Sequence, residues 1–483
     1  MRCGIPHGDA ALYNPMKKLI GTKEFYRTVA LLALPLLLQN AVSTFVNLLD
    51  NLMVGRIGTE SMSGVSIVNQ ILFVYNLCLF GGCGGASIFA AQFHGRRDTQ
   101  GVRHALRFNL LLSAGFFLAG SAVLVLWGER FIGAFLHDAG GAGDLAATLS
   151  EGRAYLNIML WGLFPFALTN AYVSILRVTG DNRLPMRASV VSILVNLVFN
   201  YLLIYGKLGF PVMGVRGAAW ATVLARYVEL GLILLGTHGK KEPPEFVRGL
   251  YARLGLPRKL AGEIFKKSLP LLVNEMFWSM GMTILTQCYS YRGLEAVAAL
   301  NIANTAANFF NTVLFTMGNI VGIILGNLLG AEEYDRARRE SVQLIALATA
   351  ASAAVGAVML LAAPWVPRLY RTEPSIMALA TGLLIIMAFS MPNHAIGMCS
   401  YWTLRAGGRT YITMAFDSGF TWAVSVPLAF ALIHYTSLGL LWVYLLVMLA
   451  DLIKLAVGLI LVHKGIWVRN LVKSPAVSGT GSK

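Results

Sequence analysis

The sequence predicts an all-α membrane protein with twelve transmembrane helices, and three observations support this prediction. Hydrophobic residues make up 56% of the 483 residues and charged residues only 13%, which is far too apolar for a soluble protein. Apolar segments long enough to cross a bilayer recur along the whole chain, and basic residues collect in alternate connections between them. The predicted spans are 29–54, 62–90, 105–127, 154–176, 187–206, 216–237, 269–291, 296–326, 340–362, 376–404, 409–434 and 438–463.

The distribution of lysine and arginine predicts the orientation of the chain. Most of the 39 basic residues lie in connections on the side of the two termini, so both termini are expected in the cytoplasm. A net charge of +16 is also found in nucleic-acid-binding proteins, but these gather basic residues on one soluble surface. We therefore expect a lipid bilayer around the chain and no nucleic-acid partner.

An internal repeat predicts that the twelve spans form two halves. At an offset of 235 residues, LPLLLQN (34–40) matches LPLLVNE (269–275), and GTESMSGVSI (58–67) matches GLEAVAALNI (293–302). At an offset of 228, Arg177 is paired with Arg405. Each half starts in the cytoplasm and has an even number of helices, so the halves are parallel repeats, with substrate expected at their interface.

The longest cytoplasmic connection separates the two halves. It contains a proline pair and eight basic residues, a composition typical of an interdomain linker. The expected parts of the chain are a cytoplasmic N-terminal segment (1–28), an N-lobe (29–237), a cytoplasmic linker (238–268), a C-lobe (269–463) and a cytoplasmic C-terminal tail (464–483).

The first span carries a stripe of polar residues on one helical face, and Asp50 is the only ionisable one among them. An acid at membrane depth is costly, and it normally faces a bundle interior or water and serves transport. The alternative is a structural aspartate that hydrogen-bonds to neighbouring helices. The stripe consists of Asn40, Ser43, Thr44, Asn47, Asp50 and Asn51.

Asparagines recur at helical spacing in three other spans. Asn69 of the second span and Asn304 and Asn308 of the eighth are candidates, together with Asn47, to line a substrate cavity. The alternative is hydrogen bonding between helices, which uses the same residue types. In the fifth span, Asn196 and Asn200 lie one turn apart, and their carboxamide oxygens suit a small hard cation or a water in a proton path.

The seventh span contains a second acid, Glu275, beside Met276 and several aromatic residues. A buried carboxylate next to such an adaptable surface attracts a lipophilic cation or carries a proton, although packing against lipid or core also explains the methionine.

The remaining charges within the spans are expected to be neutralised locally. Arg226 lies three residues before Glu229, and Asp451 three residues before Lys454, so each pair can close on its own helix. Asp417 has no such local partner.

Searches for enzymatic motifs find none. GGCGG (81–85) lies within an apolar span, where it indicates flexing or close packing rather than a phosphate loop. No Walker sequence, catalytic nucleophile, cofactor loop or metal-ligand spacing of cysteine and histidine occurs. We expect no enzymatic activity and no cofactor, so transport would be driven by an ion gradient or passive flow.

Several motifs together resemble the multidrug and toxic compound extrusion (MATE) family of the multidrug/oligosaccharidyl-lipid/polysaccharide flippase superfamily. They are LLDNLMVGRIG, ILRVTGDNRLPM, LVNLVFNYLLIYG, LPLLVNEMFWSMG and LADLIKL, and the resemblance covers residues 20–472. It implies a two-lobed secondary antiporter of the cytoplasmic (inner) membrane that exports organic cations and other amphipathic drugs or toxins by alternating access. The coupling ion would be a proton or sodium.

The resemblance also implies roles for individual residues. The coupling acid of the first helix matches Asp50, its partners on the fifth helix match Asn196 and Asn200, and a sodium ion at Asp50 is one possibility. Some members carry an aspartate where this chain has Asn200. The acid of the seventh helix matches Glu275, but the aspartate that accompanies it in some members is absent from FSMPNHAIG (389–397).

The alternative function is a lipid or lipid-linked oligosaccharide flippase of the same superfamily. A flippase handles anionic headgroups, so basic residues are expected in its cavity, and the sequence indicates only Arg226 and Lys454 at depth. This contrast favours small, amphipathic and cationic substrates, carried by a monomer.

Overall fold

The computed structural model describes residues 19–55, 57, 59–135, 145–252, 255–370 and 372–473, and these are mainly α-helical. The helices of the first half of the chain are α1 (Lys23–Gly55), α2 (Thr59–Gly95), α3 (Thr99–Phe135), α4 (Leu145–Met159), α5 (Leu163–Val178), α6 (Arg183–Tyr205) and α7 (Val215–His238). Those of the second half are α8 (Arg258–Ser290), α9 (Leu294–Gly330), α10 (Tyr334–Ala362), α11 (Pro374–Ala406), α12 (Thr410–Met414), α13 (Val426–Tyr435) and α14 (Leu440–His463).

Two of the predicted spans are built from joined helices. A 3₁₀ turn, Leu160–Gly162, connects α4 to α5, so that 145–178 forms one span. Two successive π turns, Ala415–Gly419 and Thr421–Ser425, connect α12 to α13 within the span 410–435. Short π segments inside α-helices occur frequently at functional sites.

Eleven helical segments among the described residues are long and apolar enough to cross a membrane. The predicted seventh span, 269–291, coincides with the second part of α8 to within one residue and is not among the eleven. With 33 residues α8 is long enough, but Pro270, Asn274 and Glu275 interrupt its apolar stretch. The protein is therefore an all-helical, multi-pass membrane protein by the length and composition of its helices.

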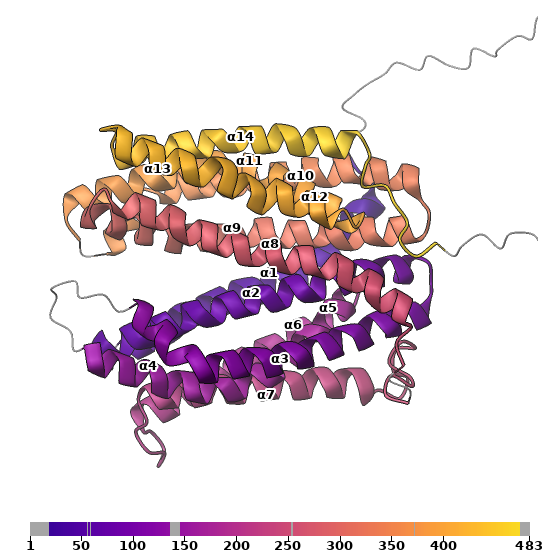
Figure 1. Ribbon diagram of the computed structural model, residues 1–483, viewed down its shortest axis with the longest axis horizontal. Coiled ribbons are helices and arrows are strands. Elements are labelled where there is room, and N and C mark those ends of the chain that lie inside the picture. Colours follow the sequence, from indigo (N-terminus) through magenta and orange to yellow (C-terminus); the bar gives the residue numbers. More distant parts are fainter. Residues whose placement is uncertain are drawn as a thin grey trace, which may run out of the picture.

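Four helices occupy the middle of the molecule (Figure 1). α2 packs along both α8 and α9, and α1 packs against α9 as well as α6. Figure 1 shows α3 to α7 on one side of these four helices and α10 to α14 on the other side. Residues far apart in the sequence therefore meet along α1, α2, α8 and α9.

The GGCGG segment lies where α2 meets α8. A Cβ atom on Gly81 would lie 2.7 Å from Cγ of Glu275 and 2.8 Å from the carbonyl oxygen of Leu271. A Cβ on Gly85 would lie 2.6 Å from the backbone nitrogen of Ser268. The close-packing interpretation of this motif is confirmed, since the glycines allow two backbones to approach each other.

The C-terminal end of α2 contacts the segment that follows α14. The Gln92 side chain donates to the carbonyl oxygen of Ala406 at 3.0 Å and accepts from the backbone nitrogen of Leu471 at 2.6 Å. A Cβ on Gly330 of α9 would overlap the Gln92 carbonyl group. The two halves are thus packed tightly at the end that holds the described ends of the chain.

The connection between the halves is shorter than predicted, because α8 begins at Arg258. Arg107 of α3 donates to the carbonyl oxygens of Gly249 and Leu250, both at 2.9 Å. This connection therefore packs on the first half.

Candidate functional site

Asp50 lies near the end of α1 and faces α6. The Asn200 side-chain nitrogen donates to Oδ1 of Asp50 at 2.6 Å and also to Oδ1 of Asn196 at 3.2 Å. The structure therefore brings together the three residues that the sequence had grouped as a coupling site. Both asparagines are buried, so the aspartate contacts groups of the protein interior.

The carboxamide of Asn196 fits this environment better when it is turned over. Its nitrogen then lies 2.9 Å from Oδ2 of Asp50, and its oxygen accepts from Oγ1 of Thr222 on α7 at 3.2 Å. Both oxygens of the carboxylate are then held by amide donors, and in this orientation Asn196 no longer accepts from the Asn200 nitrogen. By contrast, Oδ1 of Asn200 is shielded from solvent and has no hydrogen-bond partner among the described residues.

Two further helices contribute to the surroundings of this site. Tyr155 of α4 is 5% exposed, and its hydroxyl group donates to Oδ1 of Asn69 on α2 at 3.3 Å. The same tyrosine interacts with Thr222 and with the charge of Asp50. Asn69 thus belongs to the surroundings of Asp50.

The other proposed cavity residues lie elsewhere. Asn304 and Asn308 lie at exposed positions of α9, and Met276 is half-buried on α8. None of these three belongs to the pocket described below. The side chain of Asn47 lies outside the described part of the structure.

Glu275 of α8 belongs to a second polar cluster, in the other half of the chain. Its Oε1 lies 3.7 Å from Nη1 of Arg405 on α11, and the Tyr401 hydroxyl group donates to the same oxygen at 3.5 Å. The Arg405 side chain is only 3% exposed. Glu275 is therefore a largely buried acid, 13% exposed, with a buried cation beside it.

Asp417 lies in the first π turn and has two partners from other helices. Lys454 Nζ of α14 lies 2.6 Å from its Oδ1, and the Asn274 side chain donates to its Oδ2 at 3.2 Å. Ser418 donates in turn to Oδ1 of Asn274 at 2.6 Å. The widened turn thus aligns two consecutive residues with α8.

One of these contacts corrects a local pairing expected from the sequence. Lys454 pairs with Asp417 rather than with Asp451, which lies 3.9 Å from His394 instead. Arg226 donates to the Gly162 carbonyl oxygen at 3.1 Å. Residues three positions apart can meet on one helix, but Lys454 lies close to Asp417 of a neighbouring segment and pairs with that acid instead.

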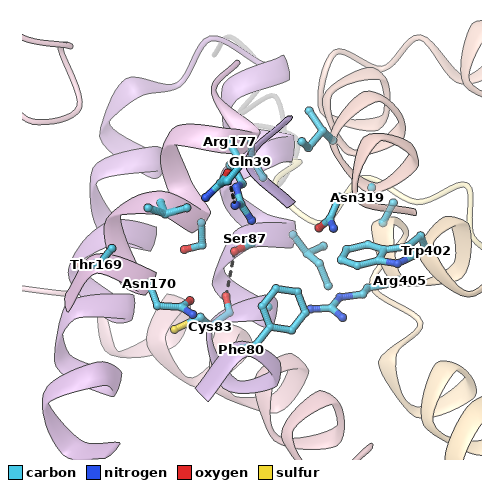
Figure 2. A pocket seen from close by; sticks show the side chains of 18 of the residues that line it. Gln39, Phe80, Cys83, Ser87, Thr169, Asn170, Arg177, Asn319, Trp402 and Arg405 are labelled. Carbon is cyan, nitrogen blue, oxygen red and sulfur yellow. Dashed lines mark hydrogen bonds between the residues drawn. The ribbon is translucent and has the colours of Figure 1, made fainter. Parts of the chain in front are cut away.

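A pocket of about 210 Å³ lies between the two halves (Figure 2). Two arginines contribute to its wall, Arg177 at the end of α5 and Arg405 at the end of α11, whereas Glu229 is its one lining acid among the described residues. The expectation that only Arg226 and Lys454 lie deep among the basic residues is therefore wrong. Phe80 and Trp402 line the pocket on the side of Arg405.

A sequence model of the MatE family matches residues 35–202 and 270–431. The chain is a MATE family transporter. The two matched segments begin at residues 35 and 270, which are the two positions that the internal repeat pairs. A MATE transporter of this kind thus contains the family unit twice, once in each half.

Known relatives of this MATE transporter match it over most of its length. A probable multidrug resistance protein of Bacillus subtilis, YoeA, is 26% identical over 87% of this chain and 89% of the relative. A probable multidrug resistance protein of Thermotoga maritima, NorM, is 26% identical over 93% of this chain and 94% of the relative. A solved structure described as the outward-facing conformation of a multidrug resistance MATE family transporter has a TM-score of 0.81 at 22% identity, covering 93% of this chain and 97% of that one. The fold is therefore shared.

Sequence reasoning missed Tyr155 and Thr222 beside Asp50, and the position of Arg177 and Arg405 in the pocket. Nothing in the periodicity of α4 or α7 marks the first two residues. A signal for the arginines did exist, because the repeat at an offset of 228 pairs them with each other.

Proposed function

We propose that this transporter is a secondary antiporter of the cytoplasmic (inner) membrane, which exports organic cations and other amphipathic drugs or toxins in exchange for protons or sodium. Its topology would be the twelve-helix arrangement of two parallel six-helix lobes, with α8 as the seventh span and both termini in the cytoplasm. The chain would act as a monomer. Its relatives' names as multidrug resistance proteins support drugs as cargo.

The observation that carries the coupling proposal is the environment of Asp50. Its carboxylate accepts a hydrogen bond from the carboxamide of Asn200, and no lysine or arginine lies within 4.0 Å of it among the described residues. An acid without an internal counter-ion gains a cation far more readily than one that already has a partner. Oδ1 of Asn200, shielded and unpartnered, supplies an oxygen for sodium or for a proton-carrying water.

Alternating access follows from the change of charge at this site. In an outward-facing state Asp50 takes up a proton or sodium, and the buried carboxylate is neutralised. Repacking of α1 against α6 then lowers the affinity for cargo, which leaves to the outside. Because coupling free energy is reciprocal, cargo and cation each lower the affinity for the other.

Proteoliposomes with separately imposed gradients test this proposal. Purified transporter is reconstituted, and efflux of an ethidium-like fluorescent cation is followed with a pH gradient alone, a sodium gradient alone, or neither. We expect one of the two gradients to make efflux at least tenfold faster than in vesicles without a gradient. Equal efflux rates in all three conditions would reject coupled antiport. If efflux were equally fast in vesicles without the protein, organic cations would be rejected as cargo.

A further inference from the structure

Two arginines related by the internal repeat line the same pocket from opposite halves of the chain. Arg177 ends α5 and Arg405 ends α11, and Figure 2 shows them on different sides of the pocket. With Glu229 as the one lining acid among the described residues, the wall carries more positive than negative charge. This balance is the reverse of what a purely cation-binding pocket would need.

Arg177 lacks part of its hydrogen bonding. Its Nη2 donates to Oε1 of Gln39 at 3.2 Å, but its Nε is shielded from solvent and has no partner among the described residues. No carboxylate lies within 4.0 Å of this guanidinium among the same residues. A half-buried cation is costly without a carboxylate partner, so a ligand in the pocket that supplies an anionic acceptor completes the site.

The opposite side of the pocket offers aromatic faces. The guanidinium carbon of Arg405 lies 4.5 Å from the centre of the Trp402 ring system and 5.4 Å from that of Phe80 (Figure 2). Nη1 of Arg405 makes the polar contacts to Tyr401 and Glu275. A flat ring entering here contacts the aromatic side chains and the guanidinium plane together.

We propose that this pocket binds a single-ring aromatic carboxylate, with the carboxylate group toward the guanidinium of Arg177 and the ring toward Phe80 and Trp402. Its volume of about 210 Å³ lies below the roughly 300–1,000 Å³ of sites for drug-sized ligands, so the part of a ligand that the pocket holds is about one ring. As a statement about cargo, this inference rests on the proposed efflux function.

Fluorine NMR on the purified transporter in detergent tests binding without any gradient, so its outcome is independent of coupled transport. The probes are 4-fluorobenzoate and 4-fluorobenzamide, which share their shape and differ in charge. We expect the benzoate to bind at least about tenfold more tightly, since charge-assisted hydrogen bonds are the stronger class. Equal affinities would overturn the proposal.

Substitutions then locate the binding. Arg177→Gln is expected to lose at least about tenfold in benzoate affinity. The affinity of Arg177→Lys should lie between those of the wild type and Arg177→Gln, because lysine keeps the charge but not the planar donor set. Arg153→Gln is the matched control: it removes the same charge from an exposed pair with Glu129 and should leave binding unchanged. Unchanged binding in Arg177→Gln contradicts the proposal. If that variant proves unfolded by its melting curve, Arg177→Lys and the benzamide comparison still decide the question.

A competition arm separates the carboxylate from a lipid phosphate. Dihexanoyl phosphatidic acid is added to the complex with 4-fluorobenzoate, and the bound fluorine signal is followed. We expect no displacement at concentrations that saturate the benzoate. Displacement at equal concentration would assign the pocket to lipid headgroups instead. Benzoate binding without gradient-driven export would leave the pocket intact and reject its role in efflux.

Discussion

The acids of the two halves differ in what surrounds them. In the first half, Asp50 faces the carboxamides of α6, and no basic side chain lies within 4.0 Å of it among the described residues. In the second half, Glu275 lies 3.7 Å from Arg405, and Asp417 lies 2.6 Å from Lys454. The family unit occurs in both halves, yet among the described residues Glu275 and Asp417 have a basic side chain within 4.0 Å whereas Asp50 has none.

This difference shows how the two halves of a duplicated fold can take different roles, one in transport and the other in stability. An acid held by a buried cation is already neutralised, and separating the pair would leave an uncompensated charge in a low-dielectric interior. Such a pair fixes neighbouring helices. An acid that faces only amides keeps its charge available for an external cation. We therefore expect substitutions at Asp50 to affect transport, and those in the second half to affect stability first.

The largest expected effect is the loss of coupling in Asp50→Asn. The carboxamide keeps the shape and an acceptor for Asn200 but cannot gain a cation, so gradient-driven efflux should fall at least tenfold in proteoliposomes. The melting temperature should stay within a few degrees of the wild type, because removing a buried charge that lacks a counter-ion costs little stability. Glu129→Gln, which removes an exposed acid, is the control and should transport normally. Full gradient-driven efflux by Asp50→Asn would reject the assignment of Asp50 as the coupling acid.

The second prediction concerns the stability of the second half. Lys454→Met leaves Asp417 as a buried charge without its cation, and breaking such a pair costs about 3 kcal/mol or more of unfolding free energy. The side chains of both residues are less than a quarter exposed, so solvent screens little of this effect. Adding Asp417→Asn to Lys454→Met should restore most of the loss, as a double-mutant cycle of thermal unfolding would measure. Purely additive losses would show that the two charges do not interact.

The third prediction tests whether contact with α2 holds the second-half cluster in place. Gly81→Ala places a methyl group against backbone and Cγ atoms of α8 at under 3 Å, so either α8 shifts or the protein loses about 1–3 kcal/mol of stability. Gly115→Ala, whose new methyl group meets no atom within 4 Å, is the matched control. Equal melting temperatures for the two variants would contradict the close packing of α2 and α8.

The smallest expected effect separates the two asparagines of the Asp50 site. Asn200→Ala removes a donor 2.6 Å from the carboxylate and an unpartnered oxygen, and should raise the ion concentration for half-maximal efflux by about tenfold. Asn196→Ala should raise it less, because Asn200 still holds the carboxylate. An exposed residue of α4, Asn157, provides the control as Asn157→Ala. The reverse order of the first two variants would make Asn196 the principal partner of Asp50.

The sequence by itself determined the membrane class, eleven of the predicted spans, the internal repeat and the grouping of Asp50 with Asn196 and Asn200. Hydrophobic length suffices for the spans, and a comparison of the chain with itself suffices for the repeat, whereas the grouping of Asp50 with Asn196 and Asn200 came from the resemblance to the MATE family. The close packing at GGCGG was one of the two roles that this glycine-rich segment allowed.

Only the tertiary structure decided which helix each polar face meets. It paired Lys454 with Asp417 instead of Asp451, and it placed Arg177 and Arg405 in the wall of a pocket rather than at a cytoplasmic surface. Helical periodicity gives the direction of a side chain around its own axis, but not the neighbour on that side. The nearest partner for a buried charge is a property of the packed helices, and packing set it here.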